Sequence, residues 1–156
     1  MEILVVMSII LVLAGLVLAT SSYVHNKGAR SRAEAEIAAM SAALENYKAD
    51  NGVYPQYAGS GTGAHALYQA LAGDGNNDIG GNILSTGVPA SSAKSYMALK
   101  PNMMKPNPPN DTTVLIDPFG DEYRYRTASA VNPTFDLWSI ANANPPADEN
   151  QWIKNW

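Results

Sequence analysis

The chain has 156 residues, a formal charge of −4 at pH 7 and no cysteine. The absence of cysteine excludes a disulfide framework and a cysteine-based metal site. Ten basic against fourteen acidic residues leave no basic patch that would neutralise phosphates, so nucleic acid is not expected to be a main ligand.

The first nineteen residues form an apolar run that only Glu2 and Ser8 interrupt. Residues 3–19 carry no charge, and a helix needs about 17–25 such residues to cross a bilayer. A secretory signal peptide would place basic residues before a shorter apolar segment, whereas here Lys27 and Arg30 follow the run. The run therefore predicts a transmembrane helix at the short end of the required length.

The same helix is predicted to continue to Asp50 as an amphipathic segment. Apolar residues recur there at alternating spacings of four and three, which is typical of a helix with one buried face. These residues are Ala33, Ile37, Met40, Leu44 and Tyr47. Asn51-Gly52 is a typical helix stop, and Pro55 follows it. We expect the first half of the helix in lipid or against other apolar helices, and the second half on a soluble domain.

After the long helix, the residues predict one small soluble domain. A short helix is expected at 64–71, and residues 82–111, rich in proline and small polar residues, are expected to form an extended loop. Three β-strands are predicted within 121–126, 134–140 and 151–156. A three-stranded sheet needs a cover on its apolar face, which we expect the long helix to provide.

Two groups of motifs resemble a known family. The segment MEILVVMSIILVLAGLVLA, with the amphipathic half-helix and DNGVYP after it, resembles the N-terminal part of type IV pilins and type II secretion pseudopilins. The segments DPFGDEYRYR, FDLWSIANAN and IKNW resemble the D-P-W-G-x-x-Y-x-Y, Y-D-L-x-S-L-G-A-D-G and I-x-N-W elements of the major pseudopilins. The match covers the N-terminal half-helix and residues 117–156, while residues 56–111 fit the family poorly.

The resemblance implies an α+β fold of the type IV pilin-like class. In that fold a long N-terminal α-helix, with an apolar first half and an amphipathic second half, packs on a small three-stranded antiparallel sheet with a long irregular loop. Residues 1–28 would be the apolar half-helix, placed in the membrane or in a filament core. Residues 29–156 would be the soluble head domain, including the amphipathic half-helix.

The resemblance also implies the function of a structural subunit in a pilus-like helical filament, the pseudopilus of type II protein secretion. Such a bacterial subunit is anchored in the inner membrane, with a periplasmic head, before assembly. Its partners would be copies of itself, the secretion or pilus assembly machinery, minor pseudopilins, and the prepilin peptidase at a methylated N-terminus.

Two other functions stay open. The first is a type IV pilin that forms extracellular surface fibres for adhesion, motility or DNA uptake. Many such pilins close their C-terminal region with a disulfide, which this chain cannot form. The second is a membrane-anchored periplasmic binding module that does not polymerise.

Glu2 is the candidate assembly residue. An ionisable side chain at the edge of an apolar helix is costly unless it is paired, and the resemblance implies a pair with the N-terminal amine of a neighbouring subunit that sets the stagger of the helices. The alternative is that Glu2 lies among lipid headgroups, where a charge costs little. The alignment also implies that a leader, its cleavage-site glycine and the first three mature residues precede Met1.

Calcium is the cofactor that the resemblance implies, in the loop between the last two strands. Calcium takes six to eight oxygen ligands, and the corresponding loop here is 141–151. Its candidate ligands are the carbonyl of Ile140 and the side chains of Asn142, Asn144, Asp148 and Glu149. Ala143 and Trp152 stand where the family has acids, and the proline pair at 145–146 could instead stiffen the loop without metal.

An enzyme is not predicted. The chain has no cysteine nucleophile, and His25 and His65 have no catalytic partner at a recognisable spacing. It also lacks the G-x-S-x-G elbow, the phosphate-binding loop and the H-E-x-x-H motif.

Overall fold

The computed structural model describes residues 2–57, 62–73, 94–107, 112–127, 131–143 and 148–156, with only the backbone described at 2, 17–22, 106, 107 and 112. The fold is α+β, with a long N-terminal helix and two small antiparallel sheets. The helices are α1 (Glu2–Asn51), α2 (Ala64–Ala72) and the 3-10 helix η1 (Pro101–Met103). The strands are β1 (Met104–Asn107), β2 (Thr112–Leu115), β3 (Arg124–Arg126), β4 (Asp136–Ser139) and β5 (Ile153–Lys154).

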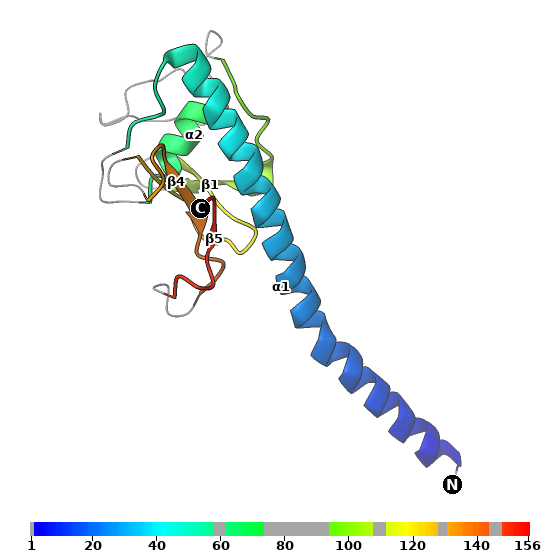
Figure 1. The fold of residues 1–156 in the computed structure, drawn as a ribbon. Helices are drawn as coiled ribbons and strands as arrows, with labels where there is room; N and C mark the ends of the chain where they lie inside the picture. The colour runs from blue at the N-terminus through cyan, green and yellow to red at the C-terminus, as the bar shows by residue number, and fades with distance from the viewer. Residues whose placement is uncertain (1, 58–61, 74–93, 108–111, 128–130, 144–147) are drawn as a thin grey trace.

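Helix α1 is a single rod of 50 residues. Figure 1 shows that the head packs on its second half only, while the first half projects away from the head. The helix ends one residue beyond the predicted position, where Gly52 adopts a φ of 78° and its N–H donates to the carbonyl of Lys48 at 2.7 Å. Glycine reaches this left-handed conformation without a Cβ clash, which explains the stop.

The predicted apolar stripe of α1 is confirmed as the buried face of the helix. All five of its residues are at most 7% exposed, and Ala43 beside them is also buried. The first four of them, from Ala33 to Leu44, join one core cluster with Leu67 and Leu71 of α2 and with Leu137 of β4. Burying an aliphatic side chain fully is worth about 1.5–3 kcal/mol, so this stripe is the main attachment of α1 to the head.

The three predicted C-terminal strands are confirmed, in the sheet order β3-β4-β5, although each is shorter than predicted. Tyr125 lies opposite Leu137, and Ser139 lies opposite Ile153. All four of these side chains are buried, whereas Trp138 between two of them is only half-buried. The alternation gives the sheet an inner face toward α1 and an outer face that carries Trp138.

The structure corrects the prediction of one sheet and of an extended loop over 82–111. In the described part of that segment, η1 leads into β1, which pairs with β2 in a second antiparallel sheet. The prolines fit because Pro101 opens η1, and because both strands of a two-stranded sheet are edges, where Pro106 can sit without breaking a ladder. Residues 82–93 and 108–111 lie outside the described part.

Helix α2 confirms the predicted short helix and fills the space between α1 and the sheets. It contacts α1, β2 and β3, and Leu67, Tyr68 and Leu71 are almost completely buried. Gly63, which precedes it, has a φ of 78° and lies directly against the backbone of Tyr125. The N–H of Tyr125 donates to the carbonyl of Thr62 at 2.7 Å, so the start of α2 is joined to β3.

Tyrosine hydroxyl groups form hydrogen bonds between the head and α1 at the borders of the apolar stripe. Tyr123 donates to Glu36 at 2.7 Å, and Tyr54 donates to Glu45 at 2.8 Å. Burial, and then the hydrogen bond to Glu36, raises the pKa of Tyr123 above its usual value. The hydroxyl therefore stays protonated and remains a donor to the helix carboxylate.

Two fully buried carboxylates hold the turns around the three-stranded sheet. Asp117 accepts the N–H groups of Phe119 and Asp121, at 2.9 and 3.0 Å, and the hydroxyl of Ser139. Burial raises the pKa of Asp117 despite these bonds. Asp136 accepts from Arg126 at 2.8 Å.

Asp136 also accepts the N–H groups of Val131 and Asn132, at 2.7 and 2.9 Å. Burial opposes ionisation of this carboxyl, but the hydrogen bonds, the strongest from Arg126, outweigh burial and lower its pKa. The Asp136 carboxylate is therefore ionised in the folded protein at neutral pH.

The contact between Gly63 and Tyr125 predicts a difference between two glycines. Gly63→Ala and Gly52→Ala both place a side chain at a φ of 78°, which costs about 1–2 kcal/mol. At Gly63 the new Cβ would also collide with the Tyr125 carbonyl, whereas nothing lies within 4 Å at Gly52. Urea unfolding should therefore show a clearly larger loss of stability for Gly63→Ala. Equal losses would contradict the described approach of the two backbones.

The Asp136 contacts predict a stability term that depends on pH. Because the folded pKa is lowered, the stabilisation is present above the unfolded pKa of about 3.9 and is lost as the pH falls through the folded value. Asp136→Asn should cost about 1.5–3 kcal/mol at pH 7, typical of a lost hydrogen bond to a charged group. Urea unfolding of both proteins at stepwise lower pH should show the difference shrinking. A difference independent of pH would contradict the proposed ionised state.

Candidate assembly interface

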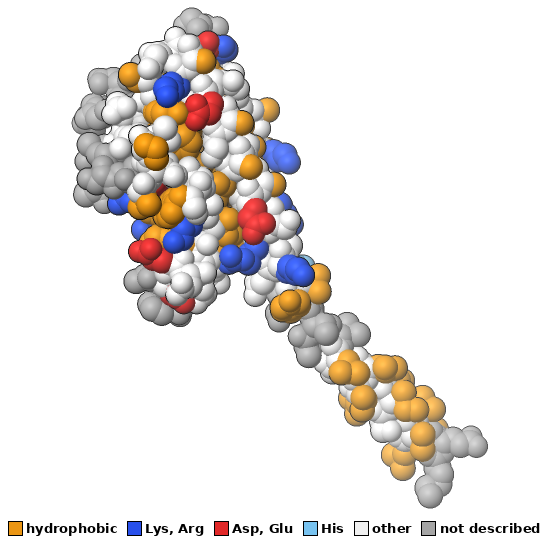
Figure 2. Space-filling model, viewed as in Figure 1, with side chains coloured by type: hydrophobic (Ala, Val, Ile, Leu, Met, Phe, Trp, Pro, Cys, Tyr) orange, Lys and Arg blue, Asp and Glu red, His pale blue; other side chains and the backbone are white. Residues whose placement is uncertain are grey.

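The first half of α1 exposes apolar side chains on every side. Large hydrophobic residues from Ile3 to Leu16 are between 53% and 76% exposed. Figure 2 shows these side chains as hydrophobic groups along the projecting end of the helix. Five consecutive residues at 9–13 are among them, and successive helical residues point about 100° apart. The apolar surface therefore surrounds the helix instead of forming a stripe.

Such a surface needs a partner that surrounds the helix. Monomeric soluble proteins rarely expose apolar patches above a few hundred Å², and a helix that is apolar all round belongs in a protein core or in lipid. The one polar side chain described between residues 3 and 16 is Ser8, whose hydroxyl donates to the carbonyl of Val5 at 2.9 Å. Because of this local hydrogen bond, the Ser8 hydroxyl needs no polar partner from outside the helix.

The sequence predicted that residues 3–19 form a transmembrane helix. No helix in the described part of the chain is long and apolar enough to span a bilayer.

The backbone of Glu2 is helical and opens α1. Its side chain lies outside the described part of the structure, as does that of every residue from 17 to 22. The predicted pairing of Glu2 with a neighbouring subunit therefore stays a prediction.

The loop predicted to bind calcium is held in place by protein contacts at both described ends. Ala141 and Asn142 adopt positive φ angles of 51° and 57°, and the N–H of Ala143 donates to the carbonyl of Ile140 at 2.9 Å. The Ile140 carbonyl, a predicted ligand, thus already has a donor. Asn142 is exposed, and Asn144 lies outside the described residues.

The two predicted carboxylate ligands also have protein partners. Asp148 accepts from the side chain of Gln151 at 2.6 Å, and this bond lowers the pKa of its carboxyl. Glu149 forms an ion pair with Lys154 at 3.7 Å. Among the described residues, no group of three or more His, Cys, Asp or Glu side chains could hold a metal ion. The predicted set also uses amide and carbonyl oxygens, and calcium therefore stays a prediction of the resemblance.

Sequence reasoning missed the residues that anchor the C-terminal segment. Asn155 accepts the N–H of Leu137 at 2.9 Å on its side-chain oxygen, and its amide donates to the carbonyl of Phe135 at 3.3 Å. Arg30 of α1 donates to the carbonyl of Gln151 at 2.8 Å. Asn155 belongs to the IKNW motif, which was a usable signal. Nothing in the sequence connects Arg30 to a residue 121 positions away.

Comparison with known proteins adds no identification, because no family model, curated protein or solved structure matches the chain.

The contacts of the C-terminal loop predict how it responds to calcium removal. If the protein contacts of Ile140, Asp148 and Glu149 hold the loop by themselves, the melting temperature should be the same in excess EGTA and in millimolar calcium. A ligand at 100 times its dissociation constant would add about 2.7 kcal/mol of stability, which is readily measured. A melting temperature that rises with calcium, and no longer does so in Asp148→Asn, would instead establish the metal site.

Proposed function

We propose that this chain is a structural subunit of a pilus-like helical filament, of the pseudopilus type found in type II protein secretion. One observation carries the proposal. A single helix has a first half that is apolar and exposed all round and a second half that buries one face against a folded head. Copies of the first half can shield one another in a central bundle, while the heads remain outside.

Burial of the exposed half would drive assembly strongly. Full burial of one large aliphatic side chain is worth about 1.5–3 kcal/mol, and eleven such residues between Ile3 and Leu16 are more than half exposed. Even after the loss of translational and rotational freedom, a bundle of these helices would gain on the order of 10 kcal/mol per subunit. Assembly would leave the head unchanged, because its core uses the other half of α1.

The places of the motif residues in the fold support a type IV pilin-like arrangement. Asp117 of DPFG is a buried turn residue bonded to Ser139, and Tyr123 and Tyr125 of the same segment are core side chains. Asn155 of IKNW joins the C-terminal segment to β4. The motif residues therefore have structural roles in the head, and this supports the proposed fold.

A type IV pilin of long surface fibres is the second candidate. It would use the same helical bundle, so the exposed half of α1 supports the pilin and the pseudopilus subunit equally. The pseudopilus is preferred because the chain has no cysteine and its C-terminal segment is held instead by Asn155 and by stacking of Trp138 on Trp152.

An inner-membrane stage, action of the prepilin peptidase and contacts with minor pseudopilins and the assembly machinery belong to the same proposal. Carbonate extraction of cell membranes tests the membrane stage separately from assembly. A chain released by carbonate would not be an integral membrane protein, whatever its ability to form filaments.

The proposal predicts filaments from the full chain when detergent is removed, visible by negative-stain electron microscopy. Ile10→Asp should abolish them, because an unpaired charge would be buried in the helical bundle. Glu2→Ala should also block assembly if Glu2 sets the stagger. Lys27→Gln, which removes an exposed charge on the same helix outside the apolar surface, is the matched control and should assemble normally.

The melting temperature of the head shows whether each variant is folded. Ile10 and Lys27 are exposed, so the melting temperature of the head should not change. Filaments of normal yield from Ile10→Asp would refute assembly through the apolar half-helix. Normal filaments from Glu2→Ala alone would refute only the stagger role of Glu2.

A further inference from the structure

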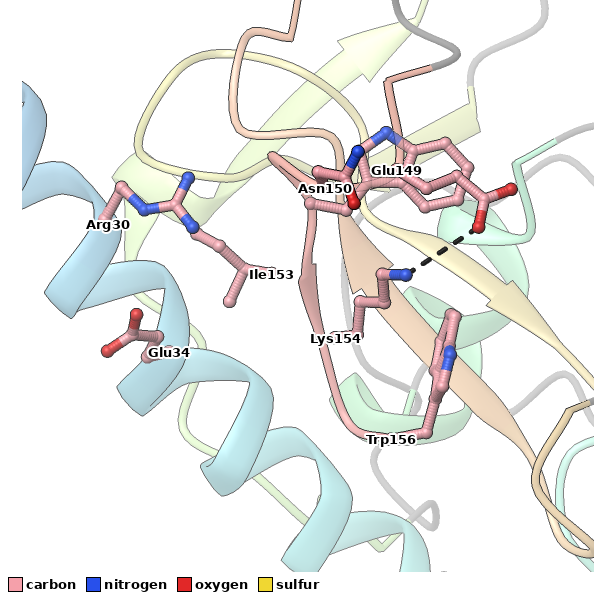
Figure 3. A pocket seen from close by; sticks show the side chains of 8 residues that line it. Arg30, Glu34, Glu149, Asn150, Ile153, Lys154 and Trp156 are labelled. Carbon is pink, nitrogen blue, oxygen red and sulfur yellow. Dashed lines mark ion pairs between the residues drawn. The ribbon is translucent and has the colours of Figure 1, made fainter.

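The outer face of the three-stranded sheet carries a row of aromatic and cationic side chains. Arg124 of β3 lies opposite Trp138 of β4, and Trp138 lies opposite Lys154 of β5. Residues that lie opposite each other in a sheet share a face, and Figure 3 shows Lys154 and Trp156 on the side of β5 turned away from α1. We call this surface the outer sheet face, and its members are Arg124, Arg126, Trp138, Trp152, Lys154 and Trp156.

All three tryptophans of the chain belong to the outer sheet face. Trp152 stacks on Trp138 with ring centroids 5.8 Å apart and an angle of 22°, and Trp156 meets Trp138 edge-on at 5.8 Å. The Arg126 guanidinium lies 5.6 Å from the centre of the Trp138 ring, and the Lys154 ammonium lies 5.2 Å from that of Trp156. Cations are attracted to the faces of indole rings, so these groups form one connected surface. Trp156 remains 39% exposed.

The cations of this face are not equally neutralised. Arg126 and Lys154 have carboxylate partners, at 2.8 and 3.7 Å. Arg124 has no hydrogen bond or ion pair within the described part of the chain. Glu122, two residues before it, accepts the hydroxyl of Thr62 at 2.5 Å instead. Arg124 therefore leaves one positive charge on the face without a counter-charge among the described residues.

Three nitrogen donors of the outer sheet face also lack an acceptor in the part of the chain that the structure describes. They are Nε of Arg124, Nε of Arg126 and Nε1 of Trp138, and all three atoms are buried. A buried donor without an acceptor is costly, and most such groups in native proteins have a partner. A second molecule that brings carboxylates to this face would let the guanidinium groups turn outward and form the missing hydrogen bonds.

We propose that the outer sheet face binds an acidic segment of another protein, in which carboxylates lie beside apolar side chains. Tryptophan and arginine are the residue types most enriched at the centres of protein–protein interfaces. The carboxylates would accept from Arg124 and Arg126 in the forked geometry that guanidinium groups favour. The apolar side chains would pack on the exposed part of the Trp156 indole.

Other partners fit the face less well. Nucleic acids and anionic lipid surfaces are bound by several basic side chains at once, whereas two of the three cations here already have carboxylate partners. A second copy in a filament is also disfavoured. Helix α1 contacts β4 and β5 from the inner side of the sheet, so assembly through α1 would leave the outer sheet face turned away from the helical bundle. The inference therefore does not rest on filament formation.

Tryptophan fluorescence can report on binding directly, because every tryptophan of the chain lies on this face. The full chain would be held in phosphocholine micelles and titrated with a short acetylated peptide that repeats Glu-Glu-Leu-Gly. The same peptide with glutamine in place of glutamate is the matched neutral probe. We expect a saturable change with the acidic peptide below about 1 mM, and roughly tenfold weaker binding of the neutral peptide.

Three variants and a control test the residues of the face. Arg124→Gln should weaken binding of the acidic peptide roughly tenfold through the loss of a charge-assisted contact, and Arg124→Lys should restore part of the affinity. Trp156→Leu should weaken binding by removing the aromatic contact. Arg32→Gln removes an exposed charge on α1, outside this face, and should bind like the parent. If Arg124→Gln lowers the melting temperature, the comparison of acidic and neutral peptides on the parent decides instead.

Three results would overturn the proposal. The first is the absence of a saturable change with the acidic peptide. The second is equal affinity of the parent for the acidic and neutral peptides, or equal affinity of the parent and a folded Arg124→Gln for the acidic peptide. The third is a change caused by a thymidine oligonucleotide, or by phosphatidylglycerol added to the micelles, but not by the peptide. None of these outcomes bears on filament assembly, which electron microscopy measures separately.

Discussion

The structure depends on the buried contact between the second half of α1 and the head. The stripe from Ala33 to Leu44 contributes one wall of the core cluster. Hydroxyl groups of Tyr123 and Tyr54 then bind Glu36 and Glu45 at the borders of that stripe. Because the apolar contact and the polar contacts act on the same helix, the head fixes the direction in which the rest of α1 projects.

The two halves of α1 therefore have different surroundings. Its second half is amphipathic and is satisfied within the subunit, whereas its first half is apolar all round and is more than half exposed at every large hydrophobic residue described. A continuous helix connects the halves without a loop. Whatever surrounds the first half, whether lipid or neighbouring helices, can thus hold the head at a defined position without changing its core.

The C-terminal segment is the second element that the fold must secure. β5 has only two residues, too few to hold an edge strand by ladder bonds alone. Asn155, the bridge from Arg30 to Gln151 and the stacked tryptophans supply the remaining attachment.

The sequence by itself determined the elements whose signals are local. The stripe of α1, its stop at Gly52 and the alternating Tyr123 and Tyr125 follow from helical and strand periodicities within a few residues. Only the tertiary structure decided the pairing of β1 with β2, the buried ionised Asp136 and the contact between Arg30 and Gln151. The proline in β1 obscures its strand pattern, and Arg30 and Gln151 lie far apart in the chain. The contacts of Asp136 gain their strength from burial, and none of these conditions leaves a periodic pattern in the sequence.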